Sequence, residues 1–180
     1  MEVYGALIRA IGPVTHARMR MAALRQRCMS AGLGNVASHL ATGNLSFSSA
    51  LPREVLLARL HEVVRSFELN NDVVLRTAAE LDAAHAHNPF PDAAADRPSQ
   101  FAVCFLAGPP LATAWLAAYP GPERLQLDGL QLYVDYPGPV SKSKLPLGSI
   151  ERRLGATMTA RNWNTVETLT LATARLVASL

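Results

Sequence analysis

Cysteine, lysine and aromatic side chains are scarce in this sequence. Only two cysteines occur. Cys28 and Cys104 each lie in an apolar segment without metal-ligand spacing, so we expect buried reduced thiols and not a disulfide framework or a thiol nucleophile. Aromatic residues make up 6% of the chain, and the strand-like segment "VYGALIRA" lacks the aromatic signature of an RNA-binding sheet. The composition therefore disfavours a nucleic-acid partner, although it does not exclude one.

Long hydrophobic runs are absent as well. No segment reaches the roughly 18 apolar residues that span a bilayer, and Glu2, Arg9 and Gly12 interrupt the apolar stretch that a signal peptide would need. With 49% hydrophobic residues, 17% charged residues and a net charge of +3, the chain is typical of a globular protein and not of a dedicated DNA binder. We therefore expect a cytoplasmic protein with no membrane partner. The oligomeric state stays open.

The first half of the chain alternates between strand-like and helix-like patterns. Its first helical pattern carries apolar residues at three- and four-residue spacing, which predicts a core-facing stripe. This stripe consists of Met21, Leu24, Cys28 and Ala31. The expected elements are a strand at 3–11, a helix at 15–34, two short strands around Thr42-Gly43-Asn44, a helix at 51–67 and a strand at 71–76. Their order, β-α-β-β-α-β, is that of a ferredoxin-like unit.

The second half repeats this order. A connecting helix at 77–86 and a linker at 88–100, rich in Pro, Asp and Ala, lead into it. Asp128-Gly129 between two strand-like segments is a strong hairpin signal. The expected elements are a strand at 101–108, a helix at 109–119, strands at 123–127 and 130–136, a helix at 147–155, a strand at 156–161 and a final helix at 164–179. The repetition is one of element order and not of residue identity.

These patterns predict an α+β protein made of two tandem ferredoxin-like units, also called α/β plaits. Each unit would have an antiparallel sheet, and a C-terminal helix would follow the second one. The expected domains are a first unit at 1–76, a connecting helix and linker at 77–99, and a second unit with the C-terminal helix at 100–180.

Several motifs resemble one bacterial family. They are "IRAIGPVTHARMRMAALR", "ATGNLSF", "VVLRTAAELDAAHAHNPF", "SKSKL" and "IERRLGATMTARNWNTVETL", and together they resemble the domain of unknown function 1697 family over nearly the whole chain. The likeness is most specific at 161–166. It implies a tandem ferredoxin-like fold in a cytoplasmic bacterial protein, from a family without an established activity.

One departure from the family pattern bears on function. After the first strand such proteins usually carry Arg-Gly-Ile-Asn-Val-Gly-Gly-Lys-Asn, whereas this chain has "RAIGPVTHA" at 9–17. Arg9 and Ile11 match, but the Gly-Gly-Lys-Asn part does not. An anion site in this loop would need different groups, so we rank it second. Its candidate residues are Arg9, Thr42 and Asn44.

The main candidate site follows from topology. In a ferredoxin-like unit the third and fourth strands both run downward, so "SKSKL" and "RNWNT" in the second unit are expected at the same edge. The edge would also hold the N-termini of the helices near 147 and 164, whose free N–H groups favour an anion. The candidate ligand-binding residues are Lys142, Ser143, Lys144, Arg161, Asn162, Trp163, Asn164 and Thr165.

Structural explanations exist for parts of these motifs. Asn164 followed by Glu167 fits a helix N-cap with its reciprocal acceptor, and Trp163 would pack just before the cap. The Ser141-x-x-Lys144 spacing matches a serine acyl enzyme, but the companion motifs are missing. "SKSKL" also fits a solvated basic loop.

The sequence leaves three functional hypotheses. The first is a protein that binds a small anionic or phosphorylated ligand at the "SKSKL"/"RNWNT" edge, and the alternative is a non-catalytic protein-interaction module that uses an exposed sheet face. An enzyme of unknown reaction ranks third, because no nucleophile and general base form a recognisable pair. No cofactor or metal is expected; His85 and His87 would point apart on a helix.

Overall fold

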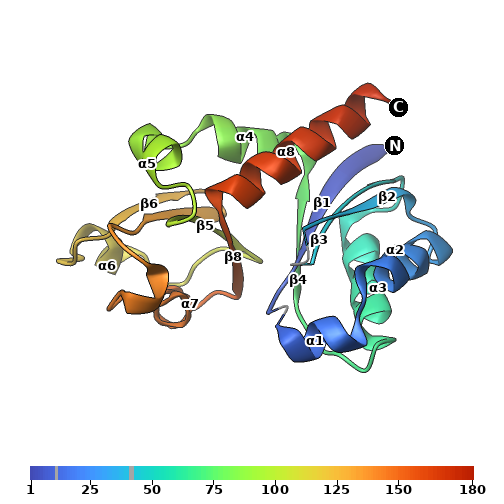
Figure 1. Cartoon of the computed structure of the whole chain (residues 1–180), viewed down its shortest axis with the longest axis horizontal. Coiled ribbons are helices and arrows are strands. Elements are labelled where there is room, and N and C mark those ends of the chain that lie inside the picture. Colours follow the sequence, from blue (N-terminus) through green and yellow to red (C-terminus); the bar gives the residue numbers. More distant parts are fainter. Residues whose placement is uncertain (11, 41–42) are drawn as a thin grey trace. The chain divides into compact units, whose positions relative to one another are not determined.

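The computed structural model describes residues 1–10, 12–40 and 43–180 and contains two four-stranded antiparallel sheets. Their strand orders are β2-β3-β1-β4 in sheet A and β6-β7-β5-β8 in sheet B (Figure 1). Each sheet has the strand order and the β-α-β-β-α-β sequence of elements of a ferredoxin-like unit. The predicted α+β class with two tandem plaits and a C-terminal helix is therefore confirmed.

Two compact units divide the chain. Unit 1 comprises Met1–Ala83 and Thr168–Leu180, and unit 2 comprises Ala84–Glu167. The C-terminal segment joins unit 1 by packing against β1 (Glu2–Ile8) at Gly5. A Cβ at that glycine would lie 2.7 Å from Leu81 Cδ1 and 3.2 Å from Leu169 Cδ2. The sequence analysis placed the whole C-terminal helix in the second unit, because no sequence pattern indicates its contact with Gly5.

Unit 1 places α2 and α3 on one face of sheet A (Figure 1). Its elements are β1, α1 (Pro13–Arg18), α2 (Met21–Ser30), β2 (Gly34–His39), β3 (Asn44–Ser49), α3 (Arg53–Arg65) and β4 (Val73–Thr77). Leu24 and Cys28 of the predicted stripe are fully buried beneath α2, and the stripe's Met21 and Ala31 are partly buried against the same core.

The helix expected at 15–34 is in fact two helices, α1 and α2. Arg20 between them is extended, with φ −67° and ψ 139°. The break allows Met19 to turn into the core, where its side chain is completely buried. The apolar periodicity did not reveal the break, because Leu24 and Cys28 keep helical spacing after it.

Arginines cap the C-termini of the paired helices in unit 1. Arg27 of α2 donates from Nη1 to the carbonyl oxygen of Ser66, the C-cap of α3, at 2.5 Å. Arg59 of α3 donates from Nη1 to the carbonyl oxygen of Ala31, the C-cap of α2, at 2.7 Å. Each guanidinium thus satisfies a carbonyl at the negative end of the neighbouring helix.

Unit 2 carries the remaining elements, with α4 shared between the units and most of α8 in unit 1. These elements are α4 (Ala78–Ala86), α5 (Pro91–Asp96), β5 (Phe101–Leu106), α6 (Ala114–Ala117), β6 (Arg124–Asp128), β7 (Gln131–Asp135), a 3-10 turn (Val140–Lys142), α7 (Leu147–Leu154), β8 (Met158–Asn162) and α8 (Trp163–Ala178). The helix expected at 109–119 shrinks to the four residues of α6, and the backbone N–H groups of Leu111 and Ala112 before it donate to the Leu154 carbonyl oxygen at 2.8 and 3.3 Å. The predicted linker contains the short helix α5.

The two faces of sheet B are packed differently. One face forms an aliphatic core with α7 that includes Cys104, Val134 and Tyr136. On the other face, which α5 covers (Figure 1), Phe101 stacks with Trp163 at a ring-centroid distance of 5.0 Å and with Tyr133 at 6.3 Å. Residues that alternate along one strand therefore enter different cores.

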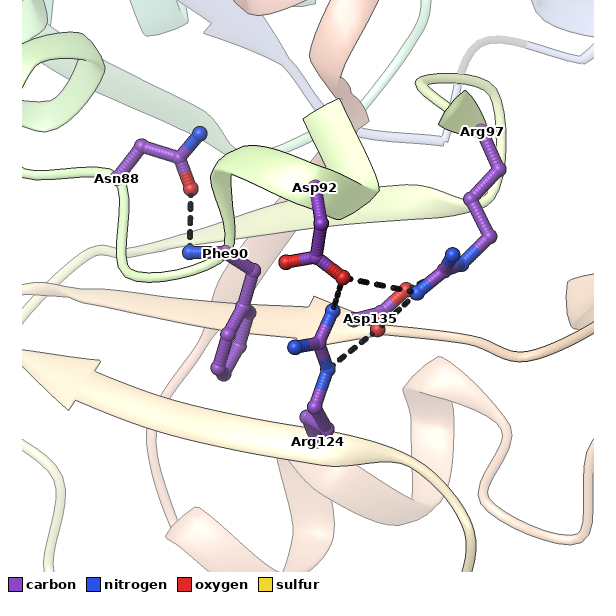
Figure 2. Close-up of polar contacts among 6 residues, drawn as sticks. All are labelled: Asn88, Phe90, Asp92, Arg97, Arg124 and Asp135. Atoms are coloured by element: carbon purple, nitrogen blue, oxygen red, sulfur yellow. Dashed lines mark hydrogen bonds and ion pairs between the residues drawn. The ribbon is translucent and has the colours of Figure 1, made fainter. Parts of the chain in front are cut away.

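An ion-pair network ties α5 and its flanking segment to sheet B. The buried carboxylate of Asp135 accepts two bonds from Arg97, at 2.9 and 2.6 Å, and one from Arg124 Nε at 2.7 Å. Arg124 also reaches Asp92 of α5, with Nη2 to Oδ2 at 2.5 Å. Figure 2 shows the Arg124 guanidinium between the two carboxylates and beside the Phe90 ring. The linker region is thereby held in a defined conformation.

We expect Asp135→Asn to lower the free energy of unfolding by about 2 kcal/mol, because charge-assisted hydrogen bonds to two arginines are weakened at a buried position. Urea denaturation measures the change. Asp92→Asn is the matched control: its side chain is 53% exposed, so its effect should be much smaller. Equal effects in the two variants would show that burial of Asp135 is not decisive.

Candidate functional site

The "RNWNT" segment begins α8 directly from the end of β8. Asn162, the last residue of β8, accepts hydrogen bonds from the Thr165 backbone N–H at 3.0 Å and the Thr165 hydroxyl at 2.9 Å. Asn162 is therefore the N-cap, and the prediction that Asn164 caps the helix is wrong. Asn164 is exposed, and Glu167 lies 3.8 Å from His85.

Trp163 and Thr165 face the interior. Trp163 is 3% exposed and stacks with His85 at 5.0 Å between ring centroids. Thr165 is 7% exposed, and its hydroxyl is used in the cap. Both side chains are therefore explained by packing and capping.

Arg161 is held close to its own strand. Its Nη1 donates to Thr159 Oγ1 at 2.8 Å and to the Ala160 carbonyl oxygen at 2.9 Å, and burial lowers its pKa to about 10. Arg76 occupies the equivalent penultimate position of β4, donates to the carbonyl oxygen of Leu75 at 2.9 Å, and also has its pKa lowered to about 10 by burial. At this position the two units share the same residue, an arginine, in addition to the same order of elements. The sequence analysis had found only the repeated order of elements.

The two predicted segments share an end of sheet B but not a face. In β5, Phe101 pairs with Asp135 and Ala102 pairs with Asn162, so β7 and β8 end at the same edge, as the topology predicted. Ala160 packs against the aliphatic core on the α7 face, so Arg161, next along the strand, points to the other face. Lys142 and Lys144 belong to a pocket on the α7 side, and Arg161 does not line it.

This pocket, which we call the lysine pocket, has a volume of about 360 Å³. Its walls include three prolines and Tyr136, and both lysines of the chain border it with exposed side chains. The lining residues are Pro122, Glu123, Tyr136, Pro137, Gly138, Pro139, Lys142, Ser143 and Lys144. Within the described chain, neither lysine forms an ion pair.

Glu123 places a carboxylate in the wall of the lysine pocket. It is 7% exposed, Tyr119 donates to its Oε2 at 2.5 Å, and Ser143 donates to its Oε1. Burial raises the pKa of Glu123, but the hydrogen bonds from Ser143 and Tyr119 outweigh it, so the pKa lies below its usual value. Burial and the bond to Glu123 raise the pKa of Tyr119 to about 12. Both hydroxyls therefore stay protonated around a charged carboxylate at neutral pH.

The sequence did not single out Glu123, Tyr119 or Tyr136. Glu123 precedes β6 in an irregular, proline-flanked segment, and its partner Ser143 is 20 positions away. Tyr136 donates its hydroxyl proton to the Leu145 carbonyl oxygen at 3.1 Å, which fixes the ring that forms part of the wall. The sequence placed both Glu123 and Tyr136 inside the strands expected at 123–127 and 130–136, so it gave no signal that they border a pocket.

The secondary candidates are part of a structural arrangement. Arg9 Nη1 lies 3.3 Å from Asp72 Oδ2, and the Arg9 carbonyl oxygen accepts a bond from Asn71 at 2.8 Å. Asn44 is fully buried in β3 and donates to the His39 carbonyl oxygen at 3.2 Å. Thr42 lies outside the described residues.

Other sequence candidates for chemistry have structural roles. Cys28 and Cys104 are fully buried, and burial raises both thiol pKa values to about 12. His87 lies 3.4 Å from Asp128, and no cluster of three metal-ligating side chains occurs in 1–10, 12–40 and 43–180. In the same ranges, no helix combines the length and apolarity that crossing a membrane requires.

The alternative hypothesis needs an exposed sheet face. In the central strands β1 and β5, every residue from Val3 to Ile8 and from Phe101 to Leu106 is buried. Successive residues in a strand point to opposite faces, so both faces of these strands are covered. The described central strands therefore offer no surface for such a partner.

Residues 1–133 match the model of a family described as "Protein of unknown function (DUF1697)". The chain belongs to this family. The match confirms the resemblance found in the sequence, although it ends before the two lysines and before "RNWNT". No curated protein matches the chain.

A solved structure shares the fold. The chain is similar to the conserved bacterial protein SP0830 from Streptococcus pneumoniae, with a TM-score of 0.71 and 20% sequence identity over 97% of this chain and 99% of that chain. The tandem-plait architecture is therefore common to two proteins that differ at most positions.

Asn162→Ala should lower the free energy of unfolding by about 1 kcal/mol, since it removes the cap of α8. Asn164→Ala, two positions along the same helix, should change it little. Thermal or urea unfolding of both variants measures the difference. A larger loss in the Asn164 variant would restore the cap assignment made from sequence.

Glu123 should make the fold more sensitive to acid. Because its pKa is lowered in the folded state, its stabilising contribution is present above the pKa of an unfolded glutamate, about 4.3, and is lost as the pH falls through the lower folded value. The parent should therefore lose more unfolding free energy between pH 6 and pH 3.5 than Glu123→Gln does. Urea titrations at several pH values test this, and parallel pH profiles would contradict it.

Proposed function

We propose that the chain binds a small organic anion in the lysine pocket, with the negative group at Lys142 and Lys144 and an apolar part against the proline and Tyr136 walls. The observation that carries the proposal is one pocket bordered by both lysines, neither of which is ion-paired within the described chain. A volume of about 360 Å³ lies at the small end of ligand pockets. The ligand class is therefore a metabolite-sized acid, either a carboxylate or a phosphate ester.

A second basic pocket is less suited to an anion. Arg27 and Arg59 line it together with Glu62. The two guanidiniums face the C-terminal ends of α2 and α3. Each of these helix ends is equivalent to roughly half a negative charge. With Glu62 added, the positive charge is nearly cancelled. The lysine pocket keeps an excess of positive charge, because Glu123 offsets only one of its two lysines.

Serine chemistry finds no support in the lysine pocket. Ser143 donates to Glu123, but a carboxylate with a lowered pKa is a weak base at neutral pH. Ser141, the serine of the Ser-x-x-Lys spacing, does not line the pocket. The geometry therefore favours binding over proton abstraction.

Isothermal titration with 3-phenylpropionate and phenyl phosphate tests the proposal. Each of Lys142→Gln and Lys144→Gln should weaken binding about threefold, and the double variant about tenfold, because exposed charges contribute little individually. Affinity should also fall as salt rises.

Arg152→Gln is the matched control, since it removes an exposed cation from α7 of the same unit without touching the pocket. Its affinity for both acids should equal that of the parent. Affinities unchanged in the double lysine variant, or lowered equally by Arg152→Gln, would overturn the proposal.

A further inference from the structure

We infer that the ligand of the lysine pocket is a zwitterion, an acid that also carries an ammonium group held by Glu123. The inference rests on the proposed function and narrows its ligand class. It starts from a feature that binding of a plain anion leaves unexplained: a buried carboxylate in the wall of a pocket bordered by cations.

Glu123 is fixed in place and still has acceptor capacity. Its two oxygens accept one hydroxyl each, from Tyr119 and from Ser143. The Ser143 hydroxyl oxygen in turn accepts the Leu145 backbone N–H at 2.8 Å. An ionised carboxylate has about four lone-pair sites. These two bonds therefore orient the group and leave about two sites free to accept further hydrogen bonds.

Both side-chain groups that hold Glu123 are neutral. No cationic side chain of the described chain forms an ion pair with it, although a carboxylate that is 7% exposed is normally paired. A ligand ammonium would supply the missing charge inside the pocket. A ligand with only a negative group would instead bring a second anion close to Glu123, which like-charge repulsion opposes.

The arrangement of charges and the size of the pocket agree with this ligand class. Lys142 and Lys144 are exposed, whereas Glu123 is buried. A bound molecule would therefore place its acidic group outward and its amine inward. At about 360 Å³ the pocket suits a molecule with the dimensions of a single amino acid.

Two probes with one carbon skeleton test the inference: phenylalanine and 3-phenylpropionate, which lacks the amine. By isothermal titration at neutral pH, the unaltered chain should bind phenylalanine roughly tenfold more tightly than 3-phenylpropionate, since the amine adds a charge-assisted hydrogen bond. In Glu123→Gln the ratio should fall to about one, with 3-phenylpropionate bound at least as tightly as by the parent. Tyr119→Phe, which keeps the carboxylate, should preserve the preference.

The outcomes separate the two proposals. Equal binding of phenylalanine and 3-phenylpropionate by the unaltered chain, with loss in the lysine variants, would overturn the zwitterion and leave the anion site standing. Binding of neither acid would overturn both. The comparison of probes uses the unaltered chain, so it remains decisive even if Glu123→Gln does not fold. A preference that persists in a folded Glu123→Gln variant would show that another group holds the amine.

Discussion

The carboxylate of Asp135 is the constraint on which the candidate site depends. Asp135 pairs with Arg124 in the register of β6 and β7, and the two side chains are ion-paired as well. Both residues are next in the chain to a wall residue of the lysine pocket. Tyr136 follows Asp135, and Glu123 precedes Arg124. The ion pair between the buried Asp135 and the exposed Arg124 on one face of the sheet thereby fixes the spacing of two wall residues of the lysine pocket at its end. Neither Asp135 nor Arg124 lines the pocket, although both hold residues that do.

Arginine and lysine are used for different purposes in this chain. Several arginines described above bind carbonyl oxygens, at helix ends as Arg27 and Arg59 do or within a strand as Arg161 does, and others bind carboxylates, as Arg97 does. A planar guanidinium with several donors is suited to such fixed bonds, whereas an ammonium on a flexible stem is not. Both lysines, among 17 basic side chains, lie at one pocket and remain exposed. The net charge of the chain therefore gives no indication that its two lysines lie at one pocket.

Much of the fold was accessible from the sequence, because apolar periodicity and turn residues act locally. The details that failed depend on contacts between distant segments. Asn164 and Glu167 satisfy the spacing of a capping pair, yet Asn162 is the cap, because strand pairing with Ala102 continues up to that residue and decides where the helix begins. Topology correctly placed "SKSKL" and "RNWNT" at one edge. The face on which each side chain lies, however, changes with every residue along a strand, so it requires the exact strand register. Glu123 belongs to no local motif, so only its folded surroundings reveal it.

In two places a strand passes into a helix with no loop between them. β4 ends at Thr77 and α4 begins at Ala78, where the Thr77 hydroxyl oxygen accepts the Glu80 N–H at 3.1 Å and Glu80 Oε2 accepts the Thr77 N–H at 2.8 Å. β8 passes into α8 at Asn162 in the same way. One extra residue at such a joint would turn the whole following helix by about 100° and carry its apolar side chains out of the core. We therefore expect insertions to be better tolerated in the irregular segments between other elements than at these two joints.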